Sequence, residues 1–244
     1  MMKKILAVKK EAPLESVNIK VHFSKELWLD VSKAGKLAEM LKPYYVQEPN
    51  LVLLPLLKIG QTIDIPVLHN LRFLDEQGLN WLELGKDFII FNSKKYSFWT
   101  DYLEIILNSI IIFKEITGIS EILDIHMTYI DTFRFPKEDF KLNDYFSLSI
   151  KIPEDWKIKP HDFFIGIVPY EDKNRKIILR LKGTTDKDDL LYRLETVSIG
   201  TDLKIPIEKE KLSNYLSETH DIIEHYFIEY LTEEFLSKLG IIIQ

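Results

Sequence analysis

The stretch from Phe98 to Ile116 constrains the fold most, because it is the most apolar run that is long enough to form a helix. With 3.6 residues per turn, spacings of four and three place large apolar side chains on one face. We predict a helix that packs on a sheet, ends near Gly118 and buries this stripe: Trp99, Leu103, Ile106, Ile110 and Phe113.

This helix is too short and too polar to cross a membrane. Its apolar centre, residues 105–113, contains Asn108 and Ser109, whereas a spanning helix needs about 20 apolar residues. The apolar run from Ile5 to Val8 is likewise shorter than the roughly 7–15 residues of a signal peptide's apolar region. The chain has no Cys, so disulfides and thiolate sites are excluded. We therefore expect a cytoplasmic protein.

Charge and glycine content exclude further functions. The chain has 32 basic and 38 acidic residues, a formal net charge of -6, whereas nucleic-acid-binding domains carry a basic surface. Its nine glycines never fall at the spacing of a Rossmann or P-loop motif. The sequence therefore disfavours nucleic-acid binding, and we predict no cofactor.

Short alternating runs predict strands around the helix. Residues 17–23 alternate apolar and polar side chains, and a helix is expected from Ser24 to just before Pro43. Strand-like runs follow at 51–57, 62–75, 79–84 and 88–92. After the central helix we predict strands at 121–135, 147–152, 163–170, 175–183 and 190–199, a short helix within 136–146 and a final helix from Lys211 to about Leu239. The fold class is therefore α+β.

The two halves align with each other. An offset of 113 residues brings Leu103 onto Leu216 and Ile110 onto Ile223, and it also brings predicted strands onto predicted strands. We predict an internal duplication, with residues 1–118 and 119–244 as two similar α+β repeats. Each repeat would have an antiparallel sheet with one long helix packed on it. No Pro-rich linker separates them, so we expect closely packed halves within one globular unit.

Four motifs follow one another along nearly the whole chain: a Pro-Leu opening before a strand, a Tyr-x-x-Trp entry to the central helix, a strand similar to Arg-Tyr-Ile-Asn, and a terminal helix. The residues that match them are Pro13, Leu14, Tyr96, Trp99, Tyr129, Ile130, His220, Phe227, Thr232 and Glu233. In this order they resemble a sporadically distributed family of uncharacterised prokaryotic proteins of about this length. Thr128 and Asp131 depart from the pattern where Arg and Asn are expected. The resemblance implies a fold without an assigned reaction, and an accessory role in a defence or toxin–antitoxin system.

Polar residues gather on the predicted strand 121–135. Asp124 and His126 share one face of it, because strand side chains alternate. Tyr129, Asp131 and Arg134 follow on or beside the same strand. If these side chains converge on a pocket, they indicate a ligand site or an enzyme. If they splay on an open face, they indicate partner binding.

Basic residues mark two predicted strands of the second half. Arg180 and Arg193 lie on adjacent strands, with Lys176 and Lys182 nearby. They form either a basic groove for an acidic partner or anionic ligand, or a solvated face paired with acidic residues of the following turn, Asp186, Asp188 and Asp189.

The histidines of the final helix do not predict a metal site. His220 and Glu224 are four residues apart, and so are Asp221 and His225. The two pairs point about 100° apart on a helix, whereas a metal needs at least three converging ligands. We predict a solvated helix face, no metal and no catalytic residue.

These observations favour a non-catalytic binding or regulatory protein. It would recognise a protein partner through its sheet face or the groove between its halves. A second copy of the chain, in a homodimer, is the other partner considered. The alternative is a small-molecule-binding protein or enzyme with a cavity between the sheet and the central helix. The predicted ligand- or partner-binding residues are Asp124, His126, Tyr129, Asp131, Arg134, Arg180 and Arg193.

Overall fold

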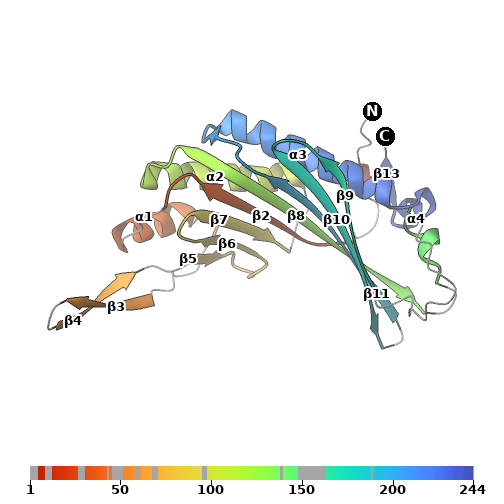
Figure 1. Cartoon of the computed structure of the whole chain (residues 1–244), viewed down its shortest axis with the longest axis horizontal. Coiled ribbons are helices and arrows are strands. Elements are labelled where there is room, and N and C mark those ends of the chain that lie inside the picture. The colour runs from red at the N-terminus through yellow and green to blue at the C-terminus, as the bar shows by residue number, and fades with distance from the viewer. Residues whose placement is uncertain are drawn as a thin grey trace. The chain divides into compact units, whose positions relative to one another are not determined.

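In a computed structural model of the chain, the described residues are 5–8, 13–26, 31–42, 44–45, 52–58, 61–67, 71–94, 98–137, 140–147, 163–187 and 189–243. The helices are α1 (Val31–Leu41), α2 (Trp99–Thr117), α3 (Lys209–Tyr230) and α4 (Glu233–Lys238), with a short 3-10 helix at Leu142–Asp144 (Figure 1). The strands are β1 (Ile5–Val8), β2 (Leu14–Phe23), β3 (Val52–Lys58), β4 (Gln61–Val67), β5 (Leu71–Leu74), β6 (Asn80–Leu84), β7 (Phe88–Ser93), β8 (Glu121–Pro136), β9 (Phe163–Glu171), β10 (Arg175–Asp186), β11 (Asp189–Gly200), β12 (Ile205–Pro206) and β13 (Ile241–Ile243).

The predicted α+β class is confirmed. Among the described residues, nine strands form one antiparallel sheet in the order β5-β6-β7-β2-β8-β11-β10-β9, with β12 against β8. Two further strand pairs, β1 with β13 and β3 with β4, lie outside this sheet. The structure thus has one main sheet where we expected one in each half, and the internal duplication stays a prediction.

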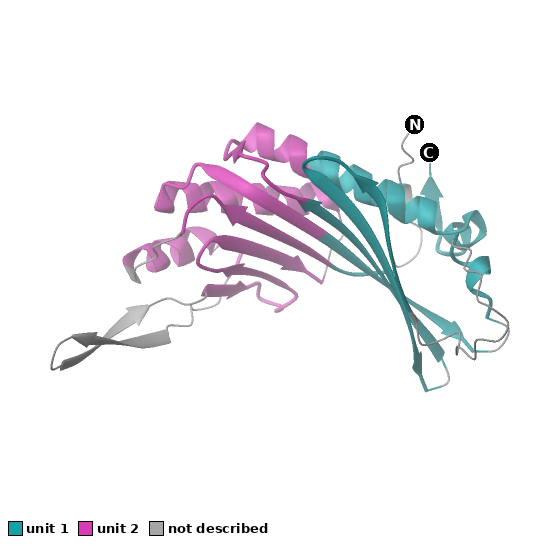
Figure 2. Ribbon diagram, in the orientation of Figure 1, with its two compact units in different colours: residues 1–16, 128–199, 217–244 teal, residues 17–127, 200–216 magenta. Residues whose placement is uncertain are grey.

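The chain divides into two compact units that interleave along the sequence (Figure 2). Unit 1 comprises residues 1–16, 128–199 and 217–244, and unit 2 comprises residues 17–127 and 200–216. Both β8 and α3 contribute residues to each unit. Neither unit therefore corresponds to a continuous half of the sequence.

In unit 2, α2 packs on the sheet through the predicted stripe. Ile106, Ile110 and Phe113 are buried, and the ring of Phe113 stacks on Phe23 of β2 with centroids 5.1 Å apart. Gly118 ends the helix in the left-handed conformation at φ 76°, as predicted. The prediction for Trp99 is wrong, because this first residue of α2 is only half-buried.

In unit 1, aromatic rings form the core between the sheet and the C-terminal helices. Phe133 and Phe135 of β8 lie within 5.3 and 5.5 Å of Phe235 of α4, and Tyr192 of β11 adds a ring 5.7 Å from Phe135. Such tilted ring pairs contribute a large buried apolar area. The aromatic content of the sequence is therefore used largely for packing here.

The predicted final helix is interrupted. It ends at Tyr230 and restarts at Glu233, because the Thr232 hydroxyl accepts a hydrogen bond from the Phe235 backbone N–H and caps the second helix.

Some predicted elements lie outside the described residues. These are the strand at 147–152 beyond Ser147, and part of the region between Ser24 and α1. In the ranges given above, no helix is long and apolar enough to span a bilayer.

Candidate functional site

Strand alternation divides the predicted site residues of β8 between the two faces of the sheet. Tyr129 and Asp131 are 7% and 5% exposed and belong to the buried series of β8. Asp124, His126 and Arg134 belong to the alternate series, on the opposite face. These five residues therefore lie neither in one pocket nor together on one open face, and their arrangement does not decide between the two functions.

A histidine pair lies on the more open face of unit 2. The rings of His22 and His126 have centroids 5.8 Å apart, and His22 lies at the same distance from the ring of Phe88. Burial lowers the pKa of both imidazoles from the ordinary value of 6.5. The positive charge of Lys20 lowers the pKa of His22 further, and the neighbouring imidazole does the same for His126. Both rings therefore favour the neutral form.

Asp124 has a structural role in the same unit. Its carboxylate accepts a hydrogen bond of 3.0 Å from the backbone N–H of Asp202. Asp202 and Lys204 both have a φ of 51°, which non-glycine residues adopt at a cost. The carboxylate thus helps to hold the turn between β11 and β12.

Arg134 is neutralised by carboxylates of unit 1. Its guanidinium donates to Asp186 at 2.8 Å and to Asp189 at 3.1 Å, on either side of the turn between β10 and β11. Asp186 and Asp189 therefore pair with Arg134 of β8, whereas we expected them to pair with the basic residues of the strands around this turn.

Arg180 and Arg193 share one carboxylate. Glu195 lies 3.6 Å from Arg180 and 3.3 Å from Arg193. Both guanidinium groups are about half-exposed, and one negative charge balances two positive ones. The structure thus brings together these two predicted residues with an excess of positive charge.

Exposed apolar side chains lie beside this pair on β9, the last strand of the sheet among the described residues. Phe164 is 66% and Val168 is 46% exposed. Phe164 faces Lys182 across the β9–β10 ladder, and Gly166 faces Arg180. We call this set the basic–apolar face: Phe164, Val168, Arg180, Lys182, Arg193 and Glu195.

The sequence predicted only part of this face. Arg180, Arg193 and Lys182 were expected on adjacent strands, whereas the exposure of Phe164 and Val168 was not predicted. Alternation places an aromatic side chain on one side of a strand but does not show whether that side is covered.

A polar cluster within unit 1 lies between β8 and α3. The Tyr129 hydroxyl lies 2.9 Å from Nδ1 of His220. One ligand atom each of His220, Asp221 and Glu224 lies within 4.8 Å of the others. Sequence spacing paired His220 with Glu224 and Asp221 with His225, about 100° apart, and did not predict that Asp221 lies close to the first pair. Helix geometry alone does not set the side-chain rotation that brings Asp221 there.

Asp131 of β8 is a buried carboxyl, 5% exposed. Its carboxyl makes no hydrogen bond or ion pair with any residue that the structure describes, and burial raises its pKa to about 8. An unpaired buried carboxylate is costly, so such groups are protonated or bind a cation.

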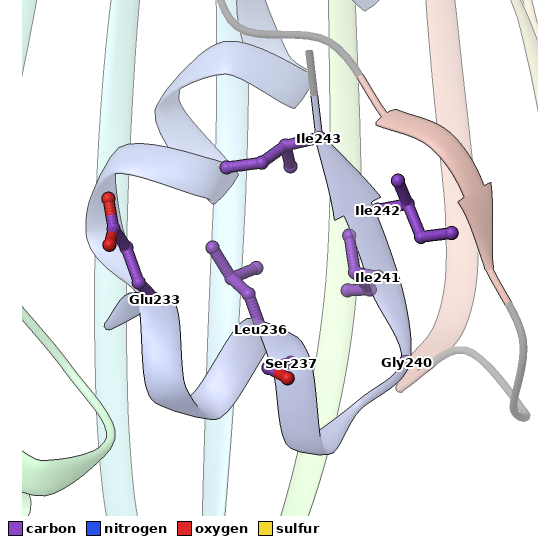
Figure 3. Close-up of a pocket in the computed structure, with 7 residues that line it drawn as sticks. All are labelled: Glu233, Leu236, Ser237, Gly240, Ile241, Ile242 and Ile243. Atoms are coloured by element: carbon purple, nitrogen blue, oxygen red, sulfur yellow. The ribbon is translucent and has the colours of Figure 1, made fainter.

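A hollow of about 490 Å³ lies in unit 1 between α4 and β13 (Figure 3). It is lined by Glu233, Leu236, Ser237 and residues 240–243. The lining is mostly aliphatic, with the carboxylate of Glu233 and the hydroxyl of Ser237 as its polar side-chain groups. It also lies at α4, whereas the alternative function placed a cavity against the central helix.

Comparison with known proteins gives no relative: no protein-family model, curated protein or solved structure matches this chain. The family resemblance of the sequence therefore stays a prediction, and function must be argued from the geometry.

Proposed function

We propose that this chain is a non-catalytic protein-binding protein, whose basic–apolar face receives an extended segment of a partner with acidic and apolar side chains. The observation that carries the proposal is the Arg180–Glu195–Arg193 group beside the exposed Phe164 and Val168. Exposed apolar side chains next to unbalanced charge are typical of interaction surfaces.

Charge complementarity selects an acidic partner. Glu195 is shared by two guanidinium groups, and Lys182 makes no ion pair with any described residue. A carboxylate from a partner would relieve this excess, and Arg binds carboxylates in a bidentate geometry.

The position of β9 at the end of the strand order favours a partner segment in an extended conformation. An edge strand offers unpaired backbone groups, to which a peptide can add as a further strand. Gly166 lies between Phe164 and Val168 on the same face and opposite Arg180. Strands are about 4.8 Å apart, so a long acidic side chain opposite Gly166 can reach across it to Arg180. The pattern that fits is apolar, acidic, apolar at alternate positions.

Fluorescence anisotropy tests the proposal with two labelled peptides of this alternating pattern that differ only in a central Glu or Lys. We expect the chain to bind the Glu peptide more tightly. Replacing Arg180 and Arg193 together by Glu should reverse the preference. Each peptide's affinity should change about tenfold, since two surface charge pairs contribute about 0.2–1 kcal/mol each.

Arg134→Glu is the matched control, because Arg134 is an exposed arginine of the same unit that already pairs with two carboxylates. It should leave the preference for the Glu peptide unchanged. Equal binding of the two peptides by the original chain would contradict the proposal, and so would an unchanged preference in the double variant.

We further propose that the two long helices descend from an internal duplication. At the offset of 113 residues, the aligned positions are buried in both helices at three places. Trp99 and Tyr226, at the ends of the aligned stripe, are only half-buried. The three matching pairs are Leu103 with Leu216, Ile106 with Thr219 and Ile110 with Ile223.

A further inference from the structure

Two of the five arginines of the chain hold their carboxylate more loosely than the other three do. Three arginines each donate to a carboxylate oxygen at 2.8 Å: Arg72, Arg134 and Arg175. Arg180 and Arg193 instead share Glu195, at distances of 3.6 and 3.3 Å. Hydrogen bonds between guanidinium and carboxylate groups are typically about 2.7–2.9 Å long. The guanidinium groups of Arg180 and Arg193 therefore keep N–H donors for a ligand.

Lys182 adds a third cation to this pair. The strands β9, β10 and β11 lie side by side in unit 1 (Figure 1), and the hairpin of β10 and β11 closes after Asp186. Counting back along both strands places Lys182 opposite Arg193. Like charges that face each other on neighbouring strands are destabilising, so this pair costs stability in the free chain. The same count agrees with an observed ion pair, Arg180 with Glu195.

The basic–apolar face carries an excess of two positive charges, because three cationic side chains share one carboxylate. No second carboxylate of the described residues pairs with Arg180, Lys182 or Arg193. A glutamate of a partner would balance only one of the two charges. A phosphate monoester carries about 1.5–2 negative charges at pH 7 and has three acceptor oxygens, so it balances both.

We propose that the partner segment on the basic–apolar face carries a phosphorylated serine or threonine at its central acidic position. This inference rests on the proposed function and names the chemistry of the partner residue opposite Gly166. Because Gly166 has no side chain and lies opposite Arg180, the phosphate can reach the guanidinium groups across β9. Arginine binds two phosphate oxygens at once, and arginine clusters recognise phosphorylated peptides.

A third labelled peptide, identical to the Glu and Lys peptides except for a central phosphoserine, tests the inference. Fluorescence anisotropy in a phosphate-free buffer gives its affinity for the full chain. The phosphoserine peptide should bind at least about tenfold more tightly than the Glu peptide, since the phosphate adds charge-assisted hydrogen bonds. The ratio of these two affinities is the quantity to compare between variants.

Arg193→Gln and Lys182→Gln each remove one of the unbalanced charges. Each should lower the ratio at least about threefold, because the second charge of the phosphate then loses its partner. Arg134→Gln is the control, because Arg134 belongs to the same unit and already pairs with two carboxylates. It should leave the ratio unchanged. Circular dichroism spectra verify that each variant is folded.

Two results would overturn the inference. The first is equal affinity of the original chain for the phosphoserine and Glu peptides; if the Glu peptide still binds more tightly than the Lys peptide, the proposed function stands without it. The second is a ratio that Arg193→Gln and Lys182→Gln leave as it is in the original chain, which would place the phosphate elsewhere. Equal binding of all three peptides would contradict the proposed function as well.

Discussion

At the residue scale, the neighbouring His22 and His126 of unit 2 make the free energy of unfolding depend on pH. Burial lowers the pKa of His22 and of His126. The carboxylates of Asp87 and Asp124 oppose the shift of His22, and Asp124 opposes that of His126, without cancelling either shift. Each ring is therefore neutral in the folded chain at a pH where it is already partly protonated in the unfolded chain. The unfolded state binds more protons around and below pH 6.5.

We therefore expect the two imidazoles to lower the free energy of unfolding as the pH decreases from about 7.5 through 6.5 to 5.5, whereas Asp131, whose pKa burial raises to about 8, acts in the opposite direction. The comparison of the original chain with His126→Gln isolates one imidazole. As the pH decreases, the free energy of unfolding should fall less, or rise more, in the variant, because it lacks one of the two groups. Urea titrations at each pH measure this change in both proteins. An equal or larger fall in the variant would show that His126 is not held in its neutral form.

At the residue scale, the sequence predicts which side chains share a face but not which face is covered. Alternation correctly places Asp124 with His126, and it separates both of them from Tyr129 and Asp131. The covering of Asp131 depends on α3, whose position on the sheet no local pattern specifies. A carboxyl between apolar neighbours at alternate positions was the available signal that this one is buried.

At the element scale, α2 shows which buried residues of a helix can be predicted from the spacing of its apolar residues. The stripe through Ile106, Ile110 and Phe113 is confirmed, and so is the stop at Gly118. Ile105 and Ile112, which lie seven residues apart on the same helix, are only half-buried. Periodicity thus locates the centre of the buried arc, while the width of the arc depends on the neighbours that pack against it.

Two isoleucines of this helix permit a matched test. Ile110→Ala should lower the free energy of unfolding by about 2–5 kcal/mol, because it removes packed methyl groups and leaves a cavity. Ile112→Ala makes the same chemical change at a half-buried position and should cost clearly less. Urea denaturation of both variants gives the comparison. Equal costs would contradict the orientation of α2 on the sheet.

The break between α3 and α4 was missed for a definable reason. The apolar stripe continues across it, so periodicity alone predicts one helix. Thr232 followed by Glu233 and Glu234 is a start signal, since Thr caps a helix and acidic residues favour its first turn. Capping residues within a periodic segment therefore deserve more weight than the stripe.

At the scale of the whole molecule, strand order is the property that the sequence could not supply. Most strands could be predicted from alternation, but β2 lies between β7 and β8, and β11 lies between β8 and β10. These neighbours are set by packing between segments far apart in the chain. The α+β class could therefore be predicted, while the single main sheet could not.

The interleaved units predict how the chain responds to division. Residues 1–118 lack the part of unit 2 at 119–127 and 200–216, and residues 119–244 lack the first segment of unit 1. We expect neither fragment alone to show a cooperative urea transition by circular dichroism, whereas the intact chain should show one. A fragment that unfolds at the same urea concentration as the intact chain would instead support two autonomous repeats.

The shared carboxylate on the basic–apolar face has a consequence for solutions of the isolated protein. Two copies that meet edge to edge at β9 would bring Arg180, Lys182 and Arg193 of each copy toward those of the other, and like charges repel. The excess of positive charge thus opposes association of two copies through the exposed apolar side chains of β9. High salt weakens this repulsion through screening, so storage at low ionic strength favours dispersed protein.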